Sequence, residues 1–114
     1  MSAMKHSLPK ELVAASTRPL VLGILARGQN YGYAILKEVG RLSAGTLDWQ
    51  EGMLYPVLHR LERDGLIEAS WSTADGRRRK YYALTELGRQ VLSTERRAWE
   101  RVHATLNLAW EGTG

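Results

Sequence analysis

Helical spacing of apolar residues marks the first half of the chain. Residues 8–16 predict a short helix with a proline in its first turn, where a missing N–H costs nothing. An almost wholly apolar second helix is expected from Thr17, a suitable N-cap, to Gly28. A third pattern begins near Asn30 and stops at the break from Ser43 to Gly45. Two helices joined by a short turn are typical of the first half of a helix-turn-helix.

The next predicted helix has two different faces. Asp48 followed by Glu51 fits a capping box, and Gln50 is the alternative start. At 100° per residue, one arc of this helix is apolar and comprises Leu54, Val57, Leu58 and Leu61. The opposite arc is small, aromatic and basic and comprises Gly52, Tyr55, Pro56, His59, Arg60 and Arg63. Such a face can donate hydrogen bonds to another surface, although an ordinary solvated face has the same pattern.

A hairpin is predicted after Gly65, the residue type that tolerates the left-handed backbone at a helix end. The expected strands are residues 66–71 and 79–84, joined by a turn that contains Asp75 and Gly76. Four consecutive cations, from Arg77 to Lys80, would then stand at the hairpin tip. A basic run is often only a solvated turn, but here it follows a helix with its own Arg and His residues. That combination favours a nucleic-acid partner.

One long helix is predicted from residue 86 to residue 111. Its apolar residues recur every three or four positions and include Val91, Trp99, Val102, Leu106 and Trp110. A helix of roughly 25 residues is roughly 37 Å long, which exceeds what a domain this small can cover. We therefore expect a second copy of the chain to pack on this stripe, with Leu12 alongside.

Length and composition bound the possible functions. A chain of 114 residues fits one domain, and its hydrophobic and charged contents, 44% and 25%, match an ordinary globular protein. The net charge is +4, yet residues 48–85 carry six basic and six acidic residues, so local charge matters more than the total. No run is long enough to span a bilayer, Met1 to Ser7 lacks signal-peptide features, and there is no cysteine. We expect a cytoplasmic protein.

Enzymatic activity is not expected. The histidines His6, His59 and His103 are far apart in the sequence and form no metal-binding or nucleophile motif. We therefore predict no metal site, no cofactor and no catalytic residue.

Three segments of the chain form a specific combination: Tyr31-Gly32-Tyr33-Ala34-Ile35, the run from Leu54 to Ile67, and the run from Gly76 to Thr85. Together they resemble the PadR family of bacterial winged-helix transcriptional regulators, and the resemblance covers almost the whole chain. The single C-terminal helix resembles the short branch of the family, which includes multidrug-sensing members. Many members carry Ser-Pro-Gly-Thr before Leu-Tyr-Pro, whereas this chain has Gln50-Glu51-Gly52-Met53. Glu51 would repel a phosphate, which shifts the expected DNA contacts to later residues.

The resemblance implies a homodimer that binds double-stranded DNA and a flat aromatic effector. In the multidrug-sensing members, a tryptophan that matches Trp99 lines a pore at the dimer centre. The ligand-binding residues it implies are Leu12, Ala15, Arg18, Pro19, Gly23, Trp99 and His103. Arg18 is unexpected there, because a cation would disfavour cationic ligands. A plain aromatic in the dimer core is the alternative for Trp99.

Together these patterns predict a mainly α fold with a small β-hairpin (α+β). The expected domains are a winged helix-turn-helix over residues 1–85, a dimerisation helix over 86–111 and a tail over 112–114. The predicted function is a sequence-specific regulator, a repressor, that binds a pseudo-palindromic operator and is released by a ligand near Trp99. The predicted DNA-binding residues are Tyr33, Gly52, Met53, Tyr55, Pro56, His59, Arg60, Arg77, Arg78, Arg79 and Lys80. The alternatives are a winged-helix protein-interaction dimer and a ligand-independent DNA-binding protein.

Overall fold

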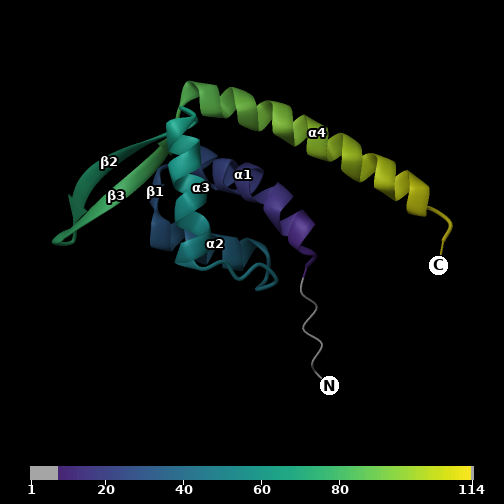
Figure 1. Cartoon of the computed structure of the whole chain (residues 1–114), viewed down its shortest axis with the longest axis horizontal. Helices are drawn as coiled ribbons and strands as arrows, with labels where there is room; N and C mark the ends of the chain where they lie inside the picture. Colours follow the sequence, from purple (N-terminus) through teal and green to yellow (C-terminus); the bar gives the residue numbers. More distant parts are fainter. Residues whose placement is uncertain (1–7, 114) are drawn as a thin grey trace, which may run out of the picture.

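The computed structural model describes residues 8–113, and the fold is mainly helical with one small antiparallel sheet (Figure 1). Its elements are α1 (Lys10–Ala26), β1 (Asn30–Tyr31), α2 (Gly32–Leu42), α3 (Glu51–Arg63), β2 (Ile67–Ala74), β3 (Arg77–Leu84) and α4 (Glu86–Trp110). The predicted α+β class is confirmed. The expectations for Met1 to Ser7, for His6 and for the last residue of the tail, Gly114, lie outside the described residues.

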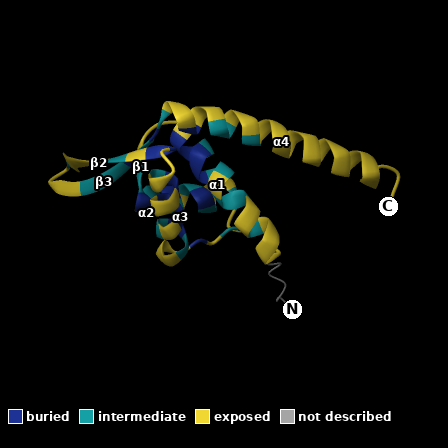
Figure 2. Cartoon of the chain, turned by 45° about the horizontal axis from the view of Figure 1, so that its top comes forward, coloured by how far each residue is buried: buried dark blue, intermediate teal, exposed yellow. Residues whose placement is uncertain are grey.

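The core lies where α1, α2 and α3 meet the base of the sheet (Figure 2). Its apolar residues come from all of these elements, and the apolar arc predicted for α3 is buried in full. Trp49, just before α3, is also buried, although its position in a loop gave no periodic signal. Among residues 8–113 no polar or charged residue is fully buried. The core is therefore held by apolar packing alone.

The first two expected helices are one. The predicted break between residue 16 and Thr17 is wrong, because α1 continues from Lys10 to Ala26. The Ser16 and Thr17 hydroxyls donate to backbone oxygens one turn back, at 2.9 Å and 3.0 Å, instead of capping a new helix. Pro19 lies inside the helix, where it removes one backbone hydrogen bond. Burial of the apolar turn that follows offsets that loss.

The hairpin, or wing, is longer than predicted. β2 and β3 pair from Ile67↔Leu84 to Ala74↔Arg77, so only Asp75 and Gly76 form the turn. Both have positive φ, 53° and 74°, as a two-residue type I′ turn requires. The four cations therefore lie along β3 rather than at the tip, and alternate between its two faces. β1 was not predicted, since a two-residue strand is too short to show alternation; it adds to β3 through Asn30↔Tyr82 and Tyr31↔Tyr81.

A tight joint fixes where α4 leaves the winged helix. The Thr85 hydroxyl donates to the Gly65 carbonyl at 2.7 Å and accepts from the Gly88 N–H at 3.0 Å, so Thr85 is the N-cap of α4. The Thr85 N–H also donates to the Leu66 carbonyl at 3.1 Å. Gly88 is buried against this carbonyl, and a Cβ at position 88 would overlap the Leu66 oxygen. The end of α3 and the start of α4 are therefore in backbone contact.

Beyond this joint α4 projects away from the domain (Figures 1 and 2). Residues 96–113 are all exposed, and the exposed side chains include Trp99, Val102, Leu106, Leu108 and Trp110. The chain is consequently elongated, with extents of 55 × 39 × 20 Å. Within residues 8–113 there is no helix with the length and apolar character needed to cross a membrane.

The joint makes Gly88 intolerant of any side chain. We expect Gly88→Ala to lower the free energy of unfolding by about 1–3 kcal/mol, because the added methyl must displace the Leu66 backbone. Gly40→Ala is the matched control: position 40 lies in α2 with open space around it, and alanine favours a helix by about 1 kcal/mol. Urea unfolding of the two variants measures the difference. Equal stabilities would show that the joint is not tight.

Candidate nucleic-acid interface

A basic and aromatic hollow lies between the wing and the first turns of α2 and α3. Its volume is about 410 Å³. The lining residues of this wing hollow are Tyr31, Gly32, Tyr33, Tyr55, Trp71, Arg77, Arg79, Lys80 and Tyr82. It thus gathers five of the predicted DNA-binding residues from three separate segments.

Four cations in or near the wing hollow each lie over an aromatic ring. The Arg79 guanidinium lies 4.4 Å from the ring centre of Tyr31, and that of Arg78 lies 4.7 Å from the ring centre of Trp71. The Nζ atoms of two lysines lie 5.6 Å from the ring centres of tyrosines, in the pairs Lys80–Tyr82 and Lys37–Tyr33. Cation–π contacts of this kind restrict the side chains while leaving their charge intact.

The cations of β3 have no acidic partner. Among residues 8–113, the ion pairs involve none of Arg77, Arg78, Arg79 and Lys80. Burial raises the pKa of the Tyr82 phenol, and the nearby Tyr55 and Glu62 raise it further, so Tyr82 stays neutral beside Lys80. The cationic side chains of the wing are therefore held in place by aromatic rings, and their positive charge is not neutralised.

Tyr55 joins α3 to the start of α2. Its ring lies over Gly32, where an added Cβ would overlap the Tyr55 hydroxyl. Tyr55 is half-buried, so it shapes the wing hollow more than it projects from it.

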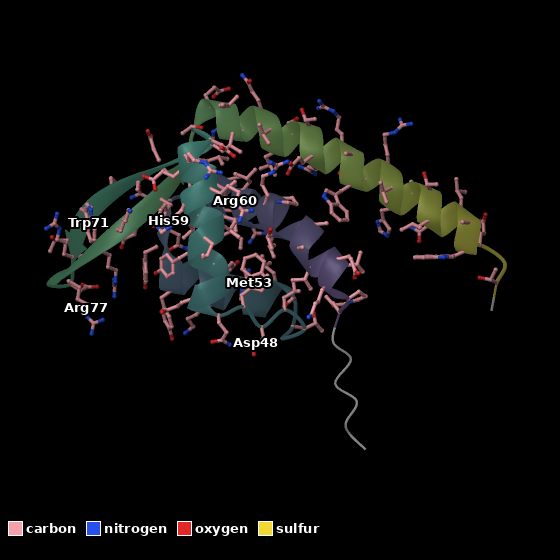
Figure 3. The ribbon with its side chains drawn as sticks, viewed as in Figure 1. Asp48, Met53, His59, Arg60, Trp71 and Arg77 are labelled. Atoms are coloured by element: carbon pink, nitrogen blue, oxygen red, sulfur yellow. The ribbon has the colours of Figure 1, made fainter. Side chains whose placement is uncertain are left out.

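The other predicted residues of α3 divide between two sides. His59 lies on the side toward the wing, and Arg60 lies on the side toward α1 and α4 (Figure 3). Pro56 and His59 are exposed, Met53 is partly buried against the core, and Gly52 lies on a separate shallow hollow at the start of α3. Arg63, also exposed, has a loose ion pair with Asp64, with Nε and Oδ1 3.7 Å apart. The outward face of α3 therefore presents Pro56, His59 and Arg63, and the exposed Arg60 lies at its edge toward α1 and α4.

A second hollow, of about 350 Å³, lies between α1, α3 and α4. This Trp99 hollow brings together four of the predicted ligand-binding residues, Ala15, Arg18, Pro19 and Trp99, and Arg60 of α3 also lines it. Arg18 forms an ion pair with Glu95, which offsets the positive charge that was unexpected at this position. Glu95 Oε1 is buried and has no hydrogen-bond partner within residues 8–113.

The far side of Trp99 borders an almost wholly apolar groove. Together with Leu20, Leu47 and Leu92 it encloses about 400 Å³. Leu12, Gly23 and His103 line neither this groove nor the Trp99 hollow. Within residues 8–113, no group of three or more His, Asp or Glu residues is placed to hold a metal ion.

Comparison with known proteins decides the family. Residues 21–94 match the Transcriptional regulator PadR-like family. The chain belongs to that family. Transcriptional regulator Rv3488 of Mycobacterium tuberculosis is 36% identical over 93 residues, which cover 82% of this chain and 84% of that protein. Because members of the family are transcriptional regulators, the prediction that the chain is not an enzyme is confirmed.

Solved PadR-like structures share the fold. A PadR-like transcriptional regulator from Bacillus cereus has a TM-score of 0.82 at 26% identity and covers 90% of this chain and 99% of its own. A PadR family transcription regulator from Clostridium difficile has a TM-score of 0.74 at 32% identity, with coverage of 82% and 96%.

Four lining residues of the wing hollow were not among the predicted DNA-binding residues of this PadR-like regulator: Tyr31, Gly32, Trp71 and Tyr82. Tyr31 is in β1, which is too short to predict. Trp71 could have been found, since it continues the alternation of Ile67 and Ala69 along β2.

Tyr31 should act only through Arg79, because the Tyr31 ring is covered by Arg79 and by Tyr81, whose ring centre is 5.5 Å away. We expect Tyr31→Leu to weaken binding to duplex DNA by roughly threefold, the value of an exposed cation–π contact. In an Arg79→Gln background the same change should have no further effect. Fluorescence anisotropy with a labelled duplex measures both. An equal loss in both backgrounds would contradict a positioning role.

Proposed function

We propose that this PadR-like regulator binds double-stranded DNA as a homodimer and represses transcription in the cytoplasm. The observation that carries the proposal is the wing hollow, where ordered cations have aromatic rings but no acidic partners. Unpaired cations on a protein surface repel one another, and a polyanion removes that cost. The exposed face of α3 would read base edges while β3 holds phosphates. Arg60 is a further candidate DNA contact, at the edge of α3 that also borders the Trp99 hollow.

The exposed stripe of α4 supports the dimer. Trp99, Val102, Leu106 and Trp110 are 39–59% exposed along a helix that projects from the domain. Exposed apolar area of this extent on one helix favours a helical partner. A second copy, with Val91 and Leu12 at the margins, would cover it. The two wings and α3 helices would then meet DNA half-sites about 34 Å apart on a pseudo-palindrome.

An effector near Trp99 would regulate this dimer. The Trp99 hollow and the apolar groove leave both sides of the indole open to a flat aromatic molecule. Arg60 and Val57 of α3 line the same hollow, so a bound molecule would contact the DNA-reading helix directly. The effector would release DNA by the difference between its affinities for the free and the DNA-bound forms.

Removing the wing charges tests DNA binding. We expect Arg77→Ala, Arg78→Ala and Lys80→Ala together to weaken duplex binding at least tenfold and to lower the salt slope by about 2–3 per protomer, because each phosphate contact contributes roughly 0.9. The control replaces three exposed cations elsewhere, Lys10, Arg89 and Arg97, and keeps the net charge equal. Titrations at several salt concentrations measure the slope. Salt-independent binding, or no duplex binding by the unaltered protein, would favour a protein-interaction dimer.

Charging the α4 stripe tests the dimer. We expect Leu106→Glu to shift the protein to monomers, since one carboxylate would be buried in an apolar interface. Ala104→Glu, on the opposite side of the same helix, should leave the dimer intact. Sedimentation equilibrium over a concentration series distinguishes the two. If both variants remain dimeric, the interface lies elsewhere.

A further inference from the structure

The exposed indole of Trp71 on the wing has no explanation in the fold. Its side chain is 58% exposed, although burying an aromatic residue is strongly favourable. The other exposed tryptophans, Trp99 and Trp110, lie on α4, where a second copy would cover them. Trp71 lies on the wing, which projects on the opposite side of the domain from the free end of α4 (Figures 1 and 3). The dimer proposed above therefore leaves Trp71 uncovered.

The register of the wing places Trp71 on the inner face of the hairpin. Trp71 pairs with Lys80, and Ala69 pairs with Tyr82. Because side chains alternate across a strand, the face that covers the core through Ile67 and Tyr82 continues outward as Trp71, Lys80 and Arg78. Trp71 therefore shares its face of the wing with Lys80 and Arg78, and Trp71 and Lys80 both line the hollow beside α3.

One side of the indole is already occupied and the other is free. The Arg78 guanidinium stacks at 4.7 Å from the ring centre, while more than half of the side chain remains exposed. Tyr31 differs, because Arg79 and Tyr81 both contact its ring and it is half-buried. Tyr31 is placed to position a cation, whereas Trp71 retains a surface of its own.

We propose that Trp71 contacts DNA directly, packing its free face on the sugar and base edges beside the phosphates that Arg78 and Lys80 hold. The partner is a polyanion because the surrounding cations have no acidic partners within residues 8–113. It is a nucleic acid because each phosphate of a duplex is flanked by a deoxyribose, whose apolar surface an exposed indole can pack on. This inference rests on the DNA binding proposed above. Trp71 would add apolar packing energy to a DNA contact that is otherwise electrostatic.

A double-mutant cycle separates contact from positioning. We expect Trp71→Ala to weaken duplex binding about tenfold, as loss of a buried apolar contact does, and to leave the salt slope unchanged. Arg78→Ala should lower the slope by about one. In the Arg78→Ala background, Trp71→Ala should still weaken binding severalfold, although the contact between the two side chains means that the two losses need not add in full. If that cost disappears, Trp71 only positions Arg78 and the inference is wrong.

Two further measurements distinguish loss of the Trp71 contact from unfolding of the hairpin. Trp71→Phe keeps a ring and should retain most of the affinity, and thermal unfolding of all variants shows whether the hairpin is intact. Duplex DNA should quench the tryptophan fluorescence of the unaltered protein, but should quench that of Trp71→Phe much less. Unchanged quenching in Trp71→Phe would overturn the contact. Duplex binding by the unaltered protein, measured first, distinguishes a failure of this inference from a failure of the proposed function.

Discussion

The backbone contact between the end of α3 and the start of α4 sets the geometry of the whole chain. Gly65 and Leu66 supply carbonyl acceptors, Thr85 supplies the hydroxyl and N–H that meet them, and Gly88 permits the approach. The direction of α4, a helix of 25 residues, is set by this joint together with the packing of its first half on α1, where Arg18 pairs with Glu95. The position of the exposed α4 stripe relative to the wing follows from it. A small change in the angle at the joint would therefore move the far end of α4 by a large distance.

On the wing, aromatic rings hold the side chains of the cations in place. On most protein surfaces, carboxylates of Asp and Glu do this. An ion pair between Arg and Glu, such as Arg41 with Glu38 here, orders a cation but neutralises it. The pairs of Arg79 with Tyr31 and Arg78 with Trp71 do not. Side-chain entropy is then partly lost before any ligand arrives, and the electrostatic attraction is kept in full. This explains how a segment with balanced charge can present a strongly positive surface.

The elements with strong periodicity were predictable, and those fixed by tertiary contacts were not. The apolar arc of α3, the Asp75–Gly76 turn and the Thr85 cap each follow from local residue types. The continuity of α1 through Pro19, the pairing of β1 and the burial of Trp49 depend on packing against distant segments. At the candidate site, helical spacing placed Arg60 with His59 on one broad face. It could not show that α1 and α4 approach one flank of that face and the wing approaches the other.

Adjacent positions in the chain thus belong to two different surfaces. His59 and Arg60 follow each other on one rigid turn of α3, yet one side is open toward the wing and the other borders Trp99. No loop separates the two surfaces, so a substitution that reshapes one also changes the environment of the other. Mutations that change which DNA sequence the wing side of α3 binds would therefore also affect the side that borders Trp99. A new specificity on one side would require compensating substitutions on the other side of the same helix.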